Sequence, residues 1–296
     1  NSESDLAGKV EDAAGIMLYH NIIISKDTIA KLAECKLIVR CGVGYDNVDW
    51  RFARERGIPV ANVPDYGTEE VADTAIGMAL SLARGINLFN NRLQRAGGAW
   101  SYTQAAPILR LRGRVFGIVG LGRIGTAAAL RAKALGMDVA FYDPLKPDGF
   151  DKALGVRRVE KLDDLLRQSF IVSVHCPLTP ETQNIIDARA ISLMPDGSYL
   201  VNTARGATVD ATAIPDAIKS GKLAGAAIDV LPHEPPPADH PLLAAWRDPN
   251  HPAHDRVIVN PHAAFYSVEG LTDMRVKGAQ ACRRALTGEV IRNVVN

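Results

Sequence analysis

The segment from Val115 to Asp143 constrains the fold of this chain more than any other. It consists of an apolar run, a turn with regularly spaced glycines, an alanine-rich helical stretch and a second apolar run that ends in an acid: VFGIVGLGRIGTAAALRAKALGMDVAFYD. Two apolar runs joined through a helix are typical of a βαβ unit with parallel strands. The segment therefore predicts an α/β fold built on a parallel sheet.

The glycines of this turn follow the G-x-G-x-x-G pattern of dinucleotide-binding proteins. Gly120 allows the tight turn, Gly122 lets a pyrophosphate approach the backbone, and Gly125 lets the helix pack close to the sheet. Arg123 and Ile124 begin the helix, whose unpaired N–H groups and positive dipole end favour an anion. We expect all five residues to bind a dinucleotide.

Asp143 indicates which dinucleotide it is. It lies about 20 residues beyond the glycine turn, where an acid accepts hydrogen bonds from the adenosine ribose hydroxyls. An NADP site has an arginine nearby for the 2′-phosphate, whereas the next residues here are Pro144, Leu145 and Lys146. The sequence predicts NAD as the cofactor, and Lys146 leaves some tolerance for NADP open.

Composition limits the class of protein and its partners. The chain has 296 residues, 47% of them hydrophobic, enough for two domains with real cores. A net charge of +1, from 34 basic and 33 acidic residues, predicts neither a nucleic-acid nor a membrane partner. Short apolar runs and the lack of an opening secretory segment predict a soluble cytoplasmic protein. The four cysteines form no C-x-x-C pair, so we expect buried thiols rather than disulfides.

Periodicity predicts the order of the elements. The chain begins with Asn1, so we expect an earlier strand and helix to be absent; a helix at 6–14 then leads into a βαβαβ rhythm over 15–62. A single helix over 68–95 is apolar on nearly every face, which predicts burial between layers or at a subunit interface. Strands at 171–175, 199–202, 226–230 and 257–260 extend a doubly wound sheet, and a last helix at 268–287 returns to the first domain.

Three polar residues directly follow predicted strands, where parallel sheets bind their ligands. They are Arg205, Glu234 and His262. A guanidinium matches a carboxylate bidentately, and an imidazole can donate or accept a proton near neutral pH. A carboxylate on the other ring nitrogen fixes the tautomer of the histidine. These are the groups that hydride transfer between a nicotinamide and a 2-keto acid requires.

Four further histidines lie in the proline-rich stretch 231–255, which we expect to be an irregular surface loop. They are His233, His240, His251 and His254. Their spacings match no usual zinc pattern, so no metal is predicted.

The motifs VNTARG, AIDVLPHEP and NPHAAFYS, preceded by GLGRIG and FYDP, resemble those of the D-2-hydroxyacid dehydrogenase family over nearly the whole chain. The resemblance implies that Arg205 binds the substrate, that His262 is the acid/base and also touches the cofactor, and that Glu234 assists it. It further implies a substrate carboxylate site in the loop RCGVGYD, made by Gly42, Val43 and Gly44. The cofactor contacts that it implies beyond the glycine turn are Cys176, Pro177, Thr182, Thr203, Ala204 and Asp229.

Within the family, the runs LYHNIIIS, IVRCGVGYDNVD, NVPDYGTEEVAD and HAAFYS look most like the C-terminal binding protein branch. That branch implies that Tyr19 and Arg40 approach the substrate. Phe265 is a predicted substrate-site residue, and the animal corepressors have Trp at this position. Their preference for a bulky thioether keto acid is therefore not expected of this chain. His20 fits a substrate contact and a core-edge residue equally well.

The sequence thus predicts an NAD-dependent D-2-hydroxyacid dehydrogenase that acts on a small 2-keto or 2-hydroxy acid, and a homodimer. Residues 1–66 and 268–296 are expected to form a flavodoxin-like substrate-binding domain, and residues 67–267 a Rossmann NAD-binding domain. Two alternatives remain open: an NAD(H)-sensing transcriptional corepressor of the C-terminal binding protein type, and a phosphoglycerate dehydrogenase.

Overall fold

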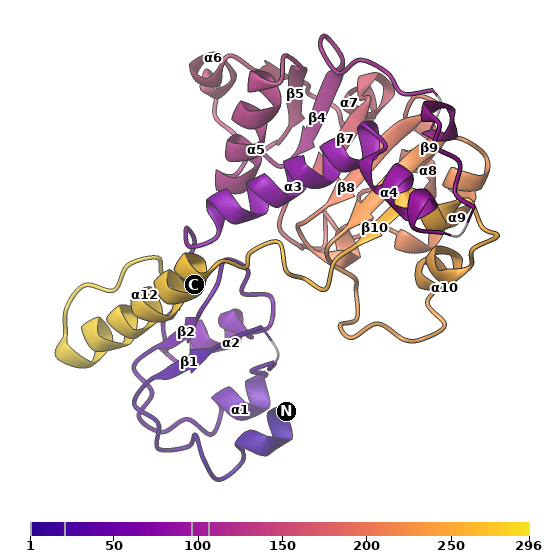
Figure 1. The fold of residues 1–296 in the computed structure, drawn as a ribbon. Coiled ribbons are helices and arrows are strands. Elements are labelled where there is room, and N and C mark those ends of the chain that lie inside the picture. The colour runs from indigo at the N-terminus through magenta and orange to yellow at the C-terminus, as the bar shows by residue number, and fades with distance from the viewer. Residues whose placement is uncertain (1, 21, 96, 106) are drawn as a thin grey trace. The chain divides into compact units, whose positions relative to one another are not determined.

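The chain divides into two units in the computed structural model, which describes residues 2–20, 22–95, 97–105 and 107–296. The first unit consists of two segments, the chain up to Thr68 and Phe265–Asn296. The second unit is Glu69–Ala264. Each unit contains one parallel sheet with helices around it (Figure 1). The predicted α/β class is therefore confirmed. Among the described residues, no helix combines the length and apolar character that crossing a membrane requires.

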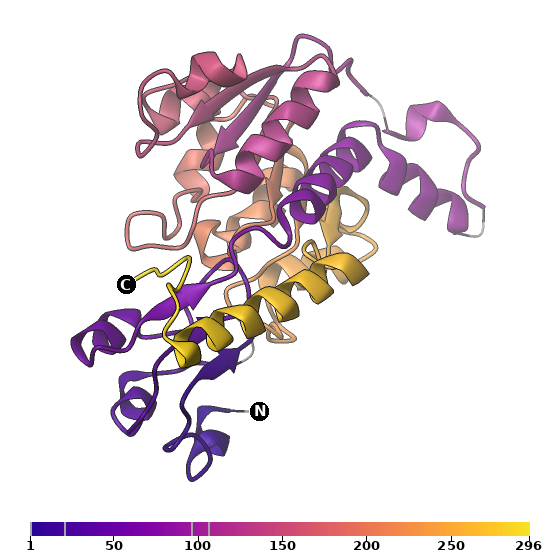
Figure 2. The same ribbon diagram turned by 90° about the vertical axis from the view of Figure 1, so that its left-hand side faces the viewer.

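The first unit is built on three parallel strands in the order β1-β2-β3. Its elements are η1 (Glu3–Leu6), β1 (Ile16–Leu18), α1 (Lys26–Ile29), β2 (Ile38–Arg40), α2 (Trp50–Glu55), β3 (Val60–Asn62) and α12 (Val268–Thr287). Alternation along β2 places Ile38 and Val39 in separate hydrophobic clusters, the second of which contains Met274 of α12. Figure 2 shows α12 running beside the strands that it covers.

The second unit contains seven parallel strands in the order β10-β9-β8-β7-β4-β5-β6. These are β4 (Val115–Val119), β5 (Asp138–Tyr142), β6 (Arg157–Arg158), β7 (Ile171–Val174), β8 (Ser198–Asn202), β9 (Leu223–Ile228) and β10 (Val257–Val259). The chain builds outward from β4 in one direction and then from β7 in the other. This reversal confirms the doubly wound sheet and places a topological switch point between β4 and β7, where such sheets bind ligands.

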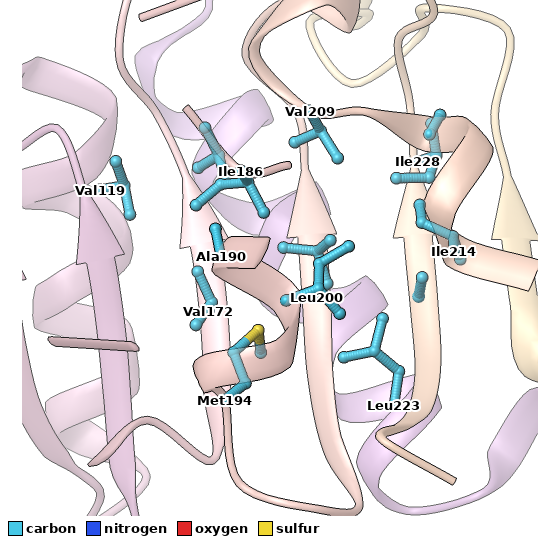
Figure 3. Packing of buried hydrophobic residues seen from close by; sticks show 14 of the residues in the cluster. Val119, Val172, Ile186, Ala190, Met194, Leu200, Val209, Ile214, Leu223 and Ile228 are labelled. Atoms are coloured by element: carbon cyan, nitrogen blue, oxygen red, sulfur yellow. The ribbon is translucent and has the colours of Figure 1, made fainter. Parts of the chain in front are cut away.

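Helices cover both faces of this sheet. They are α3 (Thr68–Ala83), α4 (Ile86–Gln94), α5 (Arg123–Ala134), α6 (Phe150–Leu154), α7 (Leu162–Gln168), α8 (Ala188–Leu193), α9 (Ile214–Lys219), α10 (Pro241–Arg247) and α11 (Ala253–Arg256), with 3-10 turns η2 (Tyr102–Ala105), η3 (Gly206–Thr208) and η4 (Ala211–Ala213). Along β8, Leu200 packs with Ala190 of α8 and Ile214 of α9 (Figure 3), whereas the next residue, Val201, packs in the cluster of α3 and α5. Both faces of the central strands are therefore buried.

The helix predicted over 68–95 is two helices. Gly85 adopts a left-handed φ of 66° and separates α3 from α4. Both helices bury residues against the same unit, so the apolar pattern continues through the break at Gly85. Periodicity alone therefore does not reveal the break. The predicted burial is confirmed for α3, whose buried residues include Ala72, Ala75 and Ala79.

Two other expectations are wrong. Instead of a helix over 6–14, the chain forms only the short 3-10 turn η1, and Gly8 with φ 75° directs the backbone away from helical geometry. The stretch 231–255 is not wholly irregular, because α10 forms within it and α11 begins in it. Pro241 opens α10 at a position where proline favours a helix start, and the Nδ1 atom of His240 accepts a hydrogen bond from Leu242 N at 3.2 Å.

Candidate active site

The turn after β4 has the backbone geometry that a bound pyrophosphate requires. Gly120 has φ 91°, and a Cβ at Gly125 would lie 2.2 Å from the Gly120 carbonyl oxygen, so neither position accepts a side chain without rearrangement. A Cβ at Gly122, in contrast, would have no atom of the described residues within 4 Å apart from those of its chain neighbours. Gly122 caps α5 without a side-chain hydrogen bond, so the open space beside it adjoins the first amides of the helix. These residues fit a dinucleotide.

Asp143 binds the glycine turn from the end of β5. Its Oδ2 accepts a hydrogen bond from Leu121 N at 2.8 Å, and its Oδ1 accepts one from Leu145 N at 3.0 Å. A carboxylate has about four acceptor positions, so each oxygen retains capacity for a ribose hydroxyl. The carboxylate therefore supports the glycine turn, and its remaining acceptor capacity is compatible with the predicted ribose contact.

The predicted adenosine-side segment, residues 176–182, follows β7. Cys176 is buried, and its backbone nitrogen would lie 2.6 Å from a Cβ at Gly120. The Thr182 hydroxyl donates to Pro177 O at 2.6 Å and accepts from Thr179 N at 2.7 Å. These bonds hold the segment in a closed turn next to the glycine turn.

The Asn202 side chain positions the residues after β8. Its amide Nδ2 donates to Arg205 O at 2.9 Å, and its Oδ1 accepts from Ala204 N at 3.0 Å. The Arg205 guanidinium in turn donates from Nη1 to Ala204 O at 2.9 Å. We did not predict Asn202 as a functional residue, although an asparagine that ends a strand immediately before a candidate arginine is a signal for such a turn.

Glu234 and His262 form a close side-chain pair at this rim. His262 Nδ1 and Glu234 Oε2 are 2.6 Å apart, and Leu231 N donates to Glu234 Oε1 at 3.0 Å. Burial opposes ionisation of Glu234, but its hydrogen bond to His262, the Leu231 amide and the nearby charge of Arg205 together hold its pKa below the ordinary value. Glu234 is thus ionised at neutral pH and accepts a hydrogen bond from the Nδ1 proton of His262.

Asp229 holds the backbone of the His262 loop. His262 has φ 53°, a left-handed conformation that costs a non-glycine residue about 1–2 kcal/mol. Its amide donates to Asp229 O at 2.7 Å, and the Asp229 carboxylate accepts from Ala263 N at 2.9 Å and Ala264 N at 3.1 Å. Asp229 is only 2% exposed, and burial raises the pKa of its carboxyl against the opposing effect of these amides. The sequence did not indicate this contact.

The histidine-rich stretch is used for local hydrogen bonding. Besides the His240 cap, His251 Nδ1 accepts from Ala253 N at 3.1 Å. His254 Nδ1 donates to Trp246 O at 2.7 Å. The bonds of His240 and His251 lie at the starts of α10 and α11, and the bond of His254 joins α11 to the last turn of α10.

The remaining predicted substrate residues belong to the first unit. Arg40 is 7% exposed and donates from Nη1 to Cys41 O at 2.9 Å; Gly42, with φ 151°, leaves room for it, since a Cβ there would lie 1.5 Å from Nη1. Val43 O accepts from Asn62 Nδ2 at 2.7 Å, which holds the loop that continues to Gly44.

Two aromatic residues of the same unit complete the predicted substrate set. The Phe265 ring lies 6.1 Å from the rings of both His20 and Tyr66, edge to face. Tyr19 is partly exposed, and burial raises the pKa of its hydroxyl. Position 21 of the LYHNIIIS run lies outside the described residues.

Comparison with curated proteins finds relatives along the full chain. This chain is 36% identical over 295 residues to D-3-phosphoglycerate dehydrogenase of Methanocaldococcus jannaschii. The aligned region covers 100% of this chain and 54% of the relative. This chain is 33% identical over 287 residues to C-terminal-binding protein 1 of Caenorhabditis elegans, covering 94% of this chain and 38% of the relative. The chain thus spans about half or less of the length of these relatives.

Solved structures and a family model agree with this relationship. D-lactate dehydrogenase from Aquifex aeolicus, solved with NAD and lactic acid, superimposes with a TM-score of 0.86 at 29% identity, over 98% of this chain and 88% of that one. Residues 76–264 match the model of the NAD-binding domain of D-isomer-specific 2-hydroxyacid dehydrogenases. This chain belongs to the D-isomer-specific 2-hydroxyacid dehydrogenase family.

Proposed function

We propose that this protein is an NAD-dependent D-2-hydroxyacid dehydrogenase that interconverts a small 2-keto acid and the corresponding 2-hydroxy acid. The observation that carries the proposal is the His262–Glu234 contact of 2.6 Å, which lies at the same sheet rim as the glycine turn and Arg205. A histidine oriented by a carboxylate beside a dinucleotide site is what reversible proton transfer coupled to hydride transfer requires.

In the proposed mechanism, each of the three residues has a distinct role. Glu234 keeps the proton of His262 on Nδ1, so that Nε2 gives a proton to the substrate oxygen during reduction and takes it back during oxidation. Arg205 binds the substrate carboxylate and stabilises negative charge on the reacting oxygen. A nicotinamide bound beside these residues would supply or accept the hydride.

The second unit would hold the cofactor. Gly120, Gly122, Gly125 and the first amides of α5 fit the pyrophosphate, and Asp143 fits the ribose. The remaining predicted cofactor contacts are Cys176, Pro177, Thr182, Thr203, Ala204 and Asp229. The buried Arg40 and the loop from Gly42 to Gly44 are proposed to bind the substrate carboxylate, with Tyr19 and Phe265 beside the rest of the substrate.

The experiment that tests this function is NADH oxidation with a panel of 2-keto acids: glyoxylate, hydroxypyruvate, pyruvate, branched keto acids and 3-phosphohydroxypyruvate. We expect turnover with at least one of them. Preference for the phosphorylated acid would support the phosphoglycerate dehydrogenase alternative, which the 36% identity to such an enzyme favours. Tight NADH binding without turnover on any acid would contradict the dehydrogenase and favour the corepressor alternative.

We also propose a cytoplasmic homodimer. All four cysteines are free thiols, which favours a reducing compartment. Trp100 and Tyr102 are 92% and 85% exposed, and large exposed aromatic side chains are typical of protein interfaces. Sedimentation equilibrium should give twice the chain mass, and a monomer at micromolar concentration would contradict the dimer.

Glu234→Gln should remove a pH-dependent contribution to stability. The folded state lowers the pKa of this carboxyl below its ordinary value near 4.5, so the carboxylate stabilises the fold above that pH and loses its effect as the pH falls through the folded pKa. Urea unfolding should therefore show wild type more stable than the variant at pH 7, with the difference shrinking below about pH 4.5.

The matched control is Asp239→Asn, which removes an exposed acid from the same stretch. A wild-type advantage over Glu234→Gln that stays constant from pH 7 to pH 3 would show that the Glu234 carboxylate contributes nothing through its charge.

A further inference from the structure

Arg158, the last residue of β6, directs its guanidinium into the loop that follows β5. Its Nη2 donates to Lys146 O at 2.6 Å and to Pro147 O at 2.9 Å. The side chain is only 17% exposed, although β6 is an edge strand of the sheet. Because hydrogen bonds from a charged donor are stronger than neutral ones, the two bonds fix the segment that carries these carbonyls.

The neighbouring strand β5 holds the guanidinium from below. Arg158 lies opposite Phe141 in the register of β5 and β6, and Val159 N donates to Phe141 O at 2.8 Å. The guanidinium carbon lies 5.7 Å from the centroid of the Phe141 ring, which is fully buried. The ion pair with Asp148 at 3.5 Å contributes little, because that carboxylate is fully exposed. The carbonyl bonds and the Phe141 ring therefore define the position of Arg158.

The loop held by Arg158 also orients the Asp143 carboxylate. Leu145 N donates to Asp143 Oδ1 at 3.0 Å, and Leu145 directly precedes the two residues whose carbonyls bind Arg158. The Leu145 side chain is 87% exposed and does not anchor the loop by packing. The backbone bond from Lys146 N to Asp143 O is long, at 3.4 Å. The place of the Leu145 amide, and with it the orientation of the carboxylate, therefore depends on Arg158.

We propose that Arg158 is a positioning residue for the adenosine ribose of NAD, an inference that rests on the NAD-dependent function proposed above. With the guanidinium in place, the Asp143 carboxylate has one orientation before the cofactor arrives, so binding does not have to order it. Without the guanidinium, ribose binding must also order the loop. Arg158 takes no part in hydride or proton transfer, so its effect should appear in cofactor affinity and not in the chemical step.

Titration of NADH into Arg158→Met and Arg158→Lys tests the proposal. Methionine keeps an unbranched apolar stem over Phe141 but donates no hydrogen bond, so the Kd of NADH, measured by fluorescence, should rise about three- to tenfold. Lysine keeps the charge without the planar fork and should recover part of this loss. The kcat at saturating NADH should stay near the wild-type value in both variants. The matched control is Arg157→Met, the preceding residue of β6, whose exposed guanidinium bonds to Gln168 instead.

The same substitution in the Asp143→Ala background shows whether Arg158 acts through the ribose contact. The double variant should bind NADH no more weakly than Asp143→Ala alone, because the group that Arg158 positions is already absent. ADP-ribose contains the adenosine ribose but no nicotinamide. Its calorimetric Kd for Arg158→Met should therefore rise by the same factor as that of NADH.

Each other outcome overturns the proposal in a recognisable way. Additive losses in the double variant would show that Arg158 supports cofactor binding by a route other than Asp143. A fall in kcat at saturating NADH would show that Arg158 only stabilises the fold of the unit. An unchanged Kd in both Arg158 variants would show that the loop holds Asp143 without it. Failure of the wild-type protein to bind NADH would instead contradict the proposed function.

Discussion

Replacing His262 by asparagine should lower kcat at least about a hundredfold while the Kd of NADH stays within twofold of wild type. Asparagine tolerates the left-handed backbone that His262 adopts at φ 53°, and its amide can still bond to Glu234, so the loop should remain in place. It has no group that exchanges a proton near neutral pH, so only the proton transfer is removed. Steady-state kinetics with the preferred keto acid, together with NADH fluorescence titration, measure both quantities.

The control is His233→Asn, an exposed histidine in the same stretch as Glu234. It should keep kcat near the wild-type value. Turnover by His262→Asn within tenfold of wild type would exclude His262 as the acid/base, and a matching loss of NADH affinity would point to a collapsed rim instead.

Arg205→Lys should lower kcat/KM for the keto acid by about a hundredfold or more, although the positive charge remains. The planar guanidinium can bind a carboxylate through two parallel hydrogen bonds and still stabilise the reacting oxygen, whereas an ammonium is a point charge without that fork. Part of the loss should appear as a raised KM, because the ground-state carboxylate is bound less well. NADH binding should be unchanged, since the glycine turn and Asp143 do not involve this side chain.

Arg247→Lys provides the same substitution at the exposed end of α10 and should have wild-type kinetics. A kcat/KM for Arg205→Lys within fivefold of wild type would mean that only the charge of this residue matters. An equal loss in NADH affinity would assign Arg205 to the cofactor rather than to the substrate.

Most of the sheet of the second unit could be predicted from local sequence. Apolar runs such as 115–119 and 171–174 are strands because neighbours on both faces bury them, and the glycine turn restricts the backbone by itself. The predictions failed where one glycine outweighed a longer pattern, as at Gly8 and Gly85, or where proline favoured a helix start, as at Pro241. Each of these local features depends on the conformation of a single residue. Hydrophobic periodicity is a property of a longer window and does not detect such a residue.

The candidate site was predictable in its residue types but not in its contacts. Arg205, Glu234 and His262 were identified because each follows a predicted strand, and parallel strands bring such residues to one rim. The use of Asp229 and Asn202 as hydrogen-bond acceptors and donors for neighbouring loops was not predicted, because their partners come from turns whose backbone conformation the sequence pattern does not specify.

The sequence by itself determined most strands of the second unit, the dinucleotide fingerprint and the residues at the strand ends, since these follow from glycine geometry and hydrophobic periodicity along the chain. Only the tertiary structure decided that Glu234 and His262, separated by 28 positions, meet at 2.6 Å, and that Asp229 stabilises the left-handed backbone at His262. These contacts join residues that follow different strands, so they form only when the strands have the right order and register. Order and register depend on the combined interactions of the whole unit.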